Sequence, residues 1–339
     1  MRKKSTIHDI AQRLNVTAST VSRALNGNPR ISQATREAVL EAAQQLNYQH
    51  NQIAAALRSG RSHIIGVMVP TTDRSFFSKV VRGIEEEASK EGYHVIICQS
   101  NDQLSSEKAN IEALLRLRAD GIIASIAKET KEFEHFAQLK HKGVPLILFD
   151  RVAEGMGVGT VVIDDFLGAY QATCHLAQQG CRRIAHFAGP QHLNIYRERL
   201  RGYRQALRDC DQPQDKSLLL FNGLQIEDGT QGMEQLLALR EPPDAVFSAS
   251  DYAALGAMQV LKARGLNIPQ VVALAGFANE PFTAFVEPAL TSVEQHSKEI
   301  GIAAARLFLE AAQTGAGYVA RQVVLAPELI VRASSLKAQ

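Results

Sequence analysis

A short segment near the N-terminus carries small polar side chains and one arginine at spacings that suit contact with DNA bases. Thr17 can cap a helix that begins at Ala18. Its outward face holds Ala18, Ser19, Ser22, Arg23 and Asn26. Small side chains let a helix enter a major groove about 12 Å wide, where the Arg23 guanidinium can donate to a guanine edge. The pattern therefore predicts a helix that reads double-stranded DNA.

Two further helices are predicted on either side of this one. Thr6 and Asp9 match a capping box, and apolar residues recur at helical spacing over residues 7–14. After a turn at 27–29, Ser32 can cap a third helix whose apolar residues are Val39, Ala43 and Leu46. Three short amphipathic helices often form a simple packing module, and it is the exposed face of the second helix that favours DNA binding.

Charge is unevenly distributed along the 339 residues. Residues 1–61 contain nine Lys and Arg residues against three acidic residues, whereas 62–339 contain 28 basic and 32 acidic residues. A basic segment attached to a mildly acidic body is typical of proteins that bind a polyphosphate. We expect Arg13, Arg30 and Arg36 to contact phosphates rather than bases.

The segment after the third helix is rich in alanine. Residues 51–58 read Asn-Gln-Ile-Ala-Ala-Ala-Leu-Arg, a composition that favours a helix. An isolated helix in water becomes stable only at roughly 12–15 residues. We therefore expect this segment to fold only in contact with a partner.

The string TIHDIAQRLNVTASTVSRALNG, followed by ISQATREAVLEAAQQLNYQHNQIAAAL, resembles the headpiece of the lactose/galactose repressor (LacI/GalR) family. The resemblance implies a helix-turn-helix that binds a palindromic operator as a homodimer, with Ala18 and Ser19 at base-reading positions. The hinge of the family reads Asn-x-x-Ala-x-x-Leu, and the match here implies that Leu57 inserts between base pairs in the minor groove. The residues assigned to DNA are Thr6, Thr17, Ala18, Ser19, Thr20, Ser22, Arg23, Asn26, Asn51, Ala54, Leu57 and Arg58.

From residue 64 onward, short apolar runs alternate with stretches of helical periodicity. Roughly nine runs, among them IIGVMV, HVIIC and VVALAGF, are strand candidates. Continuous apolar strands that alternate with helices indicate parallel sheets covered on both faces. Roughly nine strands are more than one Rossmann-like sheet usually holds. We therefore predict two doubly wound subdomains, with the first crossing of the chain between them near residues 160–163.

The resemblance covers this region as well, because the sensors of the family are similar to periplasmic sugar-binding proteins, whose chain crosses between two lobes three times. It implies further crossings near 289–293 and 320–323. The predicted architecture is a small all-α helix-turn-helix headpiece with an α/β periplasmic-binding-protein-like sensor. The predicted boundaries are 1–50 for the headpiece, 51–61 for the hinge and 62–339 for the sensor, with subdomains at about 62–161 plus 291–320 and about 162–290 plus 321–339.

Other chemistries lack their sequence motifs. Gly155, Gly157 and Gly159 precede a strand instead of opening a helix, and there is no P-loop, H-E-x-x-H or nucleophile-elbow pattern. The four cysteines show neither a C-x-x-C pair nor metal-ligand spacing, and no apolar run reaches about 18 residues. No signal peptide follows Met1. We therefore predict a cytoplasmic protein without catalysis, cofactor, metal site or membrane span.

Ligands of open α/β sheets bind at the carboxyl ends of the strands. Phe76 and Phe77 follow the first predicted strand, and Asp164 follows the fifth. The phenylalanines could equally be core residues, and Asp164 could be a helix cap. The family resemblance adds Arg199, which with Gly202 forms an R-x-x-G motif that presents a guanidinium to the effector.

One departure from the family pattern bears on the effector. The family reads Gly-Phe/Tyr-Asp after the last strand of the second lobe, and here Ala278 replaces that aspartate, which typically accepts hydrogen bonds from a sugar or a base. Asn279 or Glu280 could substitute, or the effector is not a simple free sugar, and a phosphosugar paired with Arg199 is one alternative. Asp251 matches the family's Asn-Asp motif, a position as often structural as ligand-binding. The predicted effector residues are Phe76, Phe77, Asp164, Arg199, Asp251 and Asn279.

These features together predict a transcriptional repressor that is controlled by a small molecule such as a sugar or phosphosugar. We expect the effector to shift the two lobes and so change whether paired hinge segments fold in the minor groove, with either sign of control open. A transport-type binding protein would share the sensor but would need a signal peptide and no basic headpiece. An enzyme on this fold would need a phosphate loop or a catalytic cluster.

Overall fold

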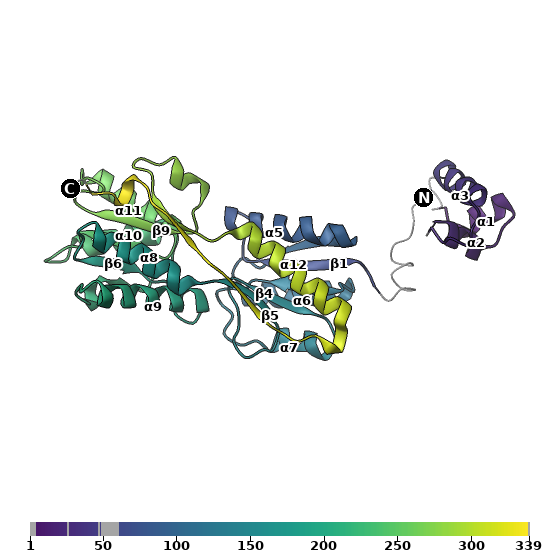
Figure 1. Cartoon of the computed structure of the whole chain (residues 1–339), viewed down its shortest axis with the longest axis horizontal. Coiled ribbons are helices and arrows are strands. Elements are labelled where there is room, and N and C mark those ends of the chain that lie inside the picture. The colour runs from purple at the N-terminus through teal and green to yellow at the C-terminus, as the bar shows by residue number, and fades with distance from the viewer. Residues whose placement is uncertain (1–4, 26, 47, 49–60, 338–339) are drawn as a thin grey trace. The chain divides into compact units, whose positions relative to one another are not determined.

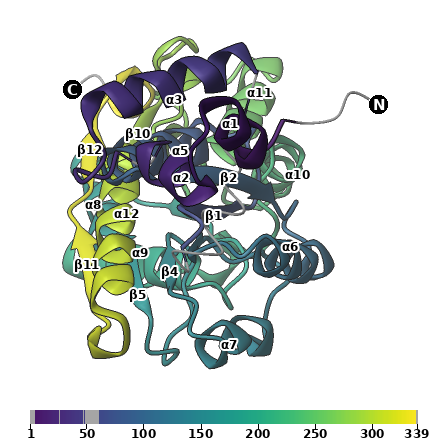
Figure 2. The ribbon, with the colours of Figure 1, turned by 90° about the vertical axis from the view of Figure 1, so that its right-hand side faces the viewer.

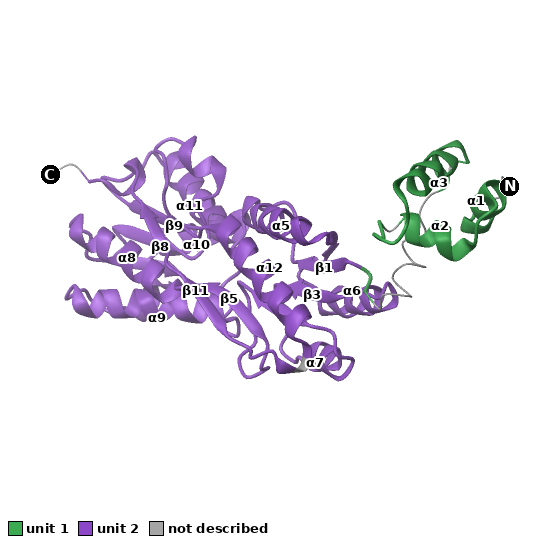
Figure 3. Cartoon of the chain, turned by 45° about the vertical axis from the view of Figure 1, so that its right-hand side comes forward, with its two compact units in different colours: residues 1–62 green, residues 63–339 purple. Residues whose placement is uncertain are grey.

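The computed structural model describes residues 5–25, 27–46, 48 and 61–337. The chain divides into two compact units, residues 1–62 and 63–339 (Figure 3). Asn26 and the predicted hinge segment 51–58 lie outside the described residues, so the predictions made for them stay predictions.

The first unit is a bundle of three short helices, α1 (Ile7–Leu14), α2 (Ala18–Leu25) and α3 (Gln33–Gln45). The predicted caps are confirmed: Thr6 and Asp9 form a capping box on α1, and Ser32 accepts a hydrogen bond from the Thr35 amide at the start of α3. The inward faces share a small core built around the fully buried Ile10, Val21 and Val39. The local sequence signals and the tertiary packing therefore agree in this unit.

The second unit contains two six-stranded sheets, each in a lobe of its own (Figure 1). The sheet of the first lobe has the strand order β11-β5-β4-β3-β1-β2 and is entirely parallel. Its strands are β1 (Ile64–Val69), β2 (His94–Gln99), β3 (Gly121–Ala124), β4 (Leu146–Phe149), β5 (Gly159–Ile163) and β11 (Gln322–Leu325).

The sheet of the second lobe has the order β12-β10-β9-β8-β6-β7. Its strands run parallel except for β12, which is antiparallel to β10. They are β6 (Ile184–Phe187), β7 (Leu219–Leu220), β8 (Ala245–Ser248), β9 (Ala273–Phe277), β10 (Thr291–Glu294) and β12 (Glu328–Ile330).

Helices cover both faces of each sheet, as the continuous apolar strands predict. In the first lobe α5 (Ser75–Ala88) and α12 (Ser297–Thr314) pack together on one face, and α6 (Leu104–Arg116) and α7 (Glu134–His141) cover the other. In the second lobe α8 (Asp165–Gln178) pairs with α9 (Asn194–Asp209), and α10 (Ile226–Leu237) pairs with α11 (Asp251–Ala263). Single 3-10 turns occupy Ser89–Glu91, Lys216–Leu218, Pro281–Ala284, Gly315–Gly317 and Ala333–Ser335.

The chain crosses between the lobes three times within the described residues, each time a few residues later than the sequence predicts. Strand β5 belongs to the first sheet, so the first crossing follows Ile163. Strand β10 belongs to the second sheet, where Val293 pairs with Phe277, so the second crossing lies between Glu294 and Ser297. The assignment of 291–294 to the first subdomain is therefore corrected, and so are the assignments of 162–163 and 322–325 to the second, because these residues lie in β5 and β11 of the first sheet.

The third crossing separates two strands that the sequence does not predict. Strand β11 joins the first sheet beside β5, and β12 joins the second sheet beside β10, so the chain changes lobe between Leu325 and Glu328. Both are short edge strands in which no residue is fully buried. Edge strands of this kind lack the continuous apolar run that marks a central strand.

Candidate functional site

Helix α2 presents the residue types that the sequence assigns to DNA. Ser19 and Arg23 are exposed, whereas Ser22 is half-buried. Ala18 is half-buried as well and packs against the core of the headpiece. A small exposed hydroxyl and a guanidinium on one face of a short helix can form hydrogen bonds to base edges.

The threonines assigned to DNA have contacts inside the headpiece. The Thr17 hydroxyl accepts a hydrogen bond from the Thr20 amide (3.2 Å) and lies 2.9 Å from the hydroxyls of Ser19 and Thr20. Thr6 donates its amide and its hydroxyl to Asp9. These contacts define helix starts, and a DNA contact from the same residues stays a prediction.

The three arginines expected at phosphates differ in their surroundings. Arg36 donates from Nη2 to the carbonyls of Gly27 and Asn28 (3.1 Å each), so its guanidinium holds the turn after α2. Arg13 donates a hydrogen bond from Nη2 to Gln45 Oε1, and Arg30 is exposed. Arg36 is therefore engaged with the backbone of the headpiece rather than fully available to a phosphate.

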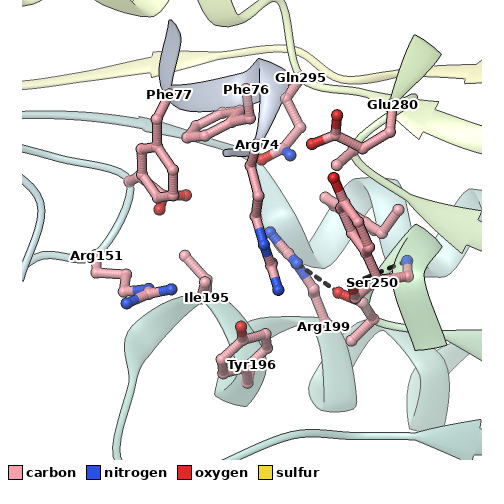
Figure 4. A pocket seen from close by; sticks show the side chains of 15 residues that line it. Arg74, Phe76, Phe77, Arg151, Ile195, Tyr196, Arg199, Ser250, Glu280 and Gln295 are labelled. Atoms are coloured by element: carbon pink, nitrogen blue, oxygen red, sulfur yellow. Dashed lines mark hydrogen bonds between the residues drawn. The ribbon is translucent and has the colours of Figure 1, made fainter. Parts of the chain in front are cut away.

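A pocket lies between the two lobes of the second unit, at the carboxyl ends of the strands (Figure 4). The space between its side chains amounts to about 420 Å³, part of it open to solvent. The first lobe contributes residues 74–77, after β1, and 150–151, after β4. The second lobe contributes the start of α9 and the residues that follow β8, β9 and β10.

Arg199 lies at the centre of the pocket and is almost fully buried. Its Nε donates to Asp165 Oδ1 (2.7 Å), and its Nη1 donates to the Ala249 carbonyl (2.9 Å). The guanidinium carbon lies 3.7 Å from the centroid of the Phe277 ring. Burial raises the pKa of Asp165 to about 7, although Arg199 opposes the shift. The pair is therefore formed before any ligand binds, and Asp165 offsets the charge of Arg199 to the extent that its carboxyl group is ionised, which decreases below about pH 7.

The loop after β4 supplies two further charged residues of the pocket, Asp150 and Arg151. Asp150 has a left-handed backbone (φ 59°), and among the described residues its buried carboxylate accepts one long hydrogen bond, from the Ser125 hydroxyl (3.4 Å). Burial raises the pKa of Asp150, although Arg151 and Arg199 oppose the shift. Arg151 is buried, pairs with Asp102, and keeps an Nε without a hydrogen-bond partner among the described residues. Strained backbone and unsatisfied polar atoms of this kind concentrate at ligand sites.

Aromatic side chains and one further unsatisfied group complete the lining. The rings of Phe76 and Phe77 lie edge to face with centroids 5.0 Å apart, above Tyr196 in the view of Figure 4. Arg74 places its guanidinium 4.9 Å from the centroid of the Tyr252 ring. The buried Gln295 Oε1 has no partner among the described residues. The pocket thus combines apolar rings with separate donors and acceptors, the composition expected of a small-molecule site.

The six predicted effector residues separate into two groups. Phe76, Phe77 and Arg199 line the pocket. Asp164 does not: its side chain caps α8 by accepting the Leu167 amide (2.8 Å), which is the alternative that the sequence leaves open.

Asp251 and Asn279 lie behind the pocket wall. Asp251 is fully buried and accepts hydrogen bonds from the Ser292 hydroxyl (2.6 Å) and the Glu280 amide (2.8 Å). Asn279 donates to Glu294 (2.7 Å) and accepts from Arg332 (2.8 Å). Of the two candidates to replace the missing aspartate at 278, the structure places Glu280 in the lining.

Several lining residues escape the sequence-based prediction. Asp150 and Arg151 follow the strand β4, and Gln295 follows β10, so the rule of carboxyl strand ends could have found them. Tyr196 lies one helical turn before Arg199 in α9 and therefore shares its face. The left-handed backbone of Asp150 has no signal in the sequence.

Direct hydrogen bonds connect the two lobes beside this pocket. Asn194, the first residue of α9, donates from Nδ2 to the Asp150 carbonyl and accepts from the Val152 amide, both at 3.0 Å. His192 lies within 2.6 Å of the Lys128 carbonyl through Nε2. These contacts hold the start of α9 against the first lobe.

Two parallel α/β lobes around a polar and aromatic pocket, preceded by a helix-turn-helix bundle, define a DNA-binding regulator with a ligand sensor. Residues 6–51 match the model of the LacI family of bacterial regulatory proteins. Residues 62–324 match the periplasmic binding proteins and sugar-binding domain of the LacI family. The chain belongs to the LacI family of bacterial transcriptional regulators.

Curated relatives and solved structures agree with this assignment. The chain is 34% identical over 331 residues to the HTH-type transcriptional repressor CytR of Escherichia coli (strain K12), covering 98% of this chain and 96% of the relative. It is 33% identical to catabolite control protein A of Priestia megaterium, with 89% and 91% covered. The lac repressor dimer bound to operator and the anti-inducer ONPF has a TM-score of 0.88 at 25% identity, with 99% and 100% covered.

A cellobiose complex of the transcriptional regulator CelR has a TM-score of 0.74 at 31% identity, with 98% and 100% covered. No helix in the described part of the chain is long and apolar enough to cross a membrane. Within the same residues, no three His, Cys, Asp or Glu side chains are grouped to hold a metal ion.

Proposed function

We propose that this regulator represses transcription as a homodimer on a palindromic operator, in the cytoplasm, and that a small molecule in the interlobe pocket controls its affinity for DNA. The observation that carries the proposal is that one chain joins the exposed Ser19 and Arg23 of α2 to a pocket lined from two lobes. In this mechanism the three crossings act as the hinge between the lobes, and their movement reaches DNA through the segment 51–58.

The charges of the pocket favour a ligand without net charge. Asp102 offsets Arg151, Asp165 offsets Arg199, and the Arg74 guanidinium stacks on Tyr252. The lining also contains two carboxyl groups. These carboxylates would repel a phosphate group, and Arg151 and Arg199 are already paired with Asp102 and Asp165. The phosphosugar alternative therefore has less support than an uncharged ligand.

The remaining groups favour a hydroxylated ligand with a flat apolar face. The rings of Phe76 and Phe77 suit one face of a sugar or of a base. Arg151 Nε can donate to an acceptor on the ligand, and Gln295 Oε1 can accept from a donor. A free sugar, a glycoside or a nucleoside meets all three requirements. The CelR complex, at 31% identity, holds the disaccharide cellobiose, which is in keeping with this class.

A thermal-shift screen tests the ligand class. The panel contains free sugars and nucleosides together with the phosphorylated form of each. We expect an uncharged compound to raise the unfolding temperature by stabilising the folded state in proportion to its saturation. The Arg151→Met variant should lose this shift, whereas Arg116→Met, at an exposed position of α6, should retain it. A shift produced only by phosphorylated compounds would contradict the assignment.

Fluorescence anisotropy on a selected palindromic operator tests the DNA role. Arg23→Ala should cost about 1–3 kcal/mol of specific binding and relax the base preference at one position, whereas Arg116→Ala should change neither. Affinity should fall steeply as salt rises, because bound phosphates release counterions. Leu57→Ala should weaken specific binding if the hinge segment inserts into the minor groove. Unchanged specificity in Arg23→Ala would refute the role given to α2.

A further inference from the structure

A second cavity lies in the first lobe and shares no residue with the interlobe pocket. It is bounded by α7, by the residues 156–158 before β5, and by the end of α12 with the turn that follows it. Figures 1 and 2 both show α7 and the end of α12 at the lower edge of this lobe. The volume between the side chains of the cavity is about 1620 Å³, part of it open to solvent. The corresponding volume of the interlobe pocket is about 420 Å³.

The cavity has a mostly apolar lining. Its floor consists of buried side chains of the lobe's core, Phe136, Leu146 and Ala311. Its walls consist of half-buried side chains, Phe133, Val144, Met156, Val158 and Tyr318. Concave surfaces lined mostly by apolar and aromatic side chains are preferred sites for binding small molecules.

Two lining residues, Lys140 and Tyr318, have hydrogen-bond donors near the segment 157–159. Lys140 Nζ lies beside Gly157, 3.9 Å from the position that a Cβ atom on this glycine would take. Lys140 is in no ion pair found among the described residues. Tyr318 Oη is buried without a hydrogen-bond partner in the described part of the chain. Both donors therefore flank the segment 157–159.

The glycines of this segment make the arrangement possible. A Cβ at Gly159 would stand 2.5 Å from Tyr318 Oη and 2.8 Å from Ile147 Cδ1, so a side chain there would displace the phenol. Gly157 has a positive φ of 64°, which other residues rarely adopt. Gly157, just before β5, and Gly159, its first residue, thus leave room for Lys140 and Tyr318 beside the same segment.

We propose that this cavity binds a small aromatic anion. Its rings occupy the apolar part of the cavity, and its carboxylate or sulfonate group pairs with Lys140 and accepts a hydrogen bond from Tyr318. Glu134, the acidic residue of the lining, is in the first turn of α7, whereas Lys140 is in the last. The two ends of the cavity therefore differ in charge, and an anionic group is favoured only at the end beside 157–159.

Titration of the full chain with 1-anilinonaphthalene-8-sulfonate, followed by fluorescence, tests the proposal. We expect saturable binding at one site per chain. Lys140→Glu should weaken it at least about tenfold, and Tyr318→Phe about fivefold, the effect of one hydrogen bond. Lys142→Glu is the matched control, because Lys142 is exposed at the end of α7 but does not line the cavity, and it should leave the affinity unchanged.

Two further measurements separate a specific site from general adsorption of the dye. Ala137 is exposed on α7 and lines the cavity, so Ala137→Trp should fill it and abolish binding while thermal unfolding stays cooperative. The neutral analogue N-phenyl-1-naphthylamine should bind at least about tenfold more weakly than the sulfonate. Full binding by Ala137→Trp, or equal losses in Lys140→Glu and Lys142→Glu, would overturn the proposal.

Discussion

Replacing Arg199 with methionine should destabilise the second lobe by several kcal/mol, and a second substitution at Asp165 should restore part of that loss. The two side chains form a pair at 2.7 Å in which each is about 5% exposed or less. Methionine keeps much of the length of arginine but cannot offset a carboxylate. Arg199→Met therefore leaves Asp165 buried without its partner.

The expected magnitude follows from this burial. Removing one partner of a buried ion pair costs about 3–5 kcal/mol, because the charge that remains is uncompensated. The double variant Asp165→Asn/Arg199→Met removes both charges and retains the loss of the hydrogen bond to Ala249, about 1–3 kcal/mol, together with the loss of the guanidinium contact with the Phe277 ring. The single variant Asp165→Asn completes the double-mutant cycle, and for two side chains in direct contact we expect a coupling free energy of about 0.5–3 kcal/mol.

Urea unfolding followed by far-ultraviolet circular dichroism measures these differences, since the chain has no tryptophan. Without Arg199, the pKa of Asp165 should rise further above about 7, so the cost of Arg199→Met should be larger at pH 8 than at pH 5.5. This expectation is refuted if the double variant loses as much free energy of unfolding as Arg199→Met and Asp165→Asn together, at both pH values. Arg199 would then not be held in the pocket by its pair with Asp165.

Three further predictions concern other parts of the chain. Burial raises the pKa of Asp251 to about 7, so the protonated carboxyl group stabilises the fold below about pH 4. This contribution, roughly 4 kcal/mol in the free energy of unfolding, is lost as the pH rises through about 7. Asp251→Asn should flatten this pH dependence, measured by urea unfolding. Asn194→Ala should speed hydrogen exchange at the Val152 amide, which loses its acceptor. Ser32→Ala should lower the stability of the headpiece by about 1 kcal/mol, measured by hydrogen exchange in α3 of the full chain.

Each of these predictions has an outcome that contradicts it. A stability profile between pH 4 and 8 that is the same in Asp251→Asn would mean that the carboxyl does not titrate in this range. Unchanged exchange at Val152 would mean that the lobes do not meet through Asn194. For the headpiece, Ser32→Gly is the comparison, because glycine is tolerated at a helix start and should cost only a few tenths of a kcal/mol.

The headpiece and the central strands could be predicted from the sequence because their local signals match their final packing. Ser32 both begins a helical pattern and caps α3. The run IIGVMV is apolar along its whole length because β1 is buried on both faces. Strands β11 and β12 could not be predicted in this way, since edge strands expose half of their side chains.

The residues that line the pocket are harder to predict from the sequence, for a different reason. Arg199 stands out through a motif, but Asp150 enters the pocket through a left-handed backbone that is set by tertiary packing. Asp164 and Asp165 are neighbours of the same type, and only the geometry of α8 decides that the first caps the helix and the second reaches Arg199. A sequence pattern cannot separate such neighbours.

The three crossings between the lobes have a consequence for synthesis on the ribosome. The headpiece is complete once α3 has emerged, whereas both sheets wait for strands that come from the last twenty residues of the chain, β11 for the first and β12 for the second. A nascent or prematurely ended chain can therefore carry a finished DNA-binding bundle while both halves of its sensor lack an edge strand. Translation thus delivers the part that reads the operator before the part that can respond to a signal.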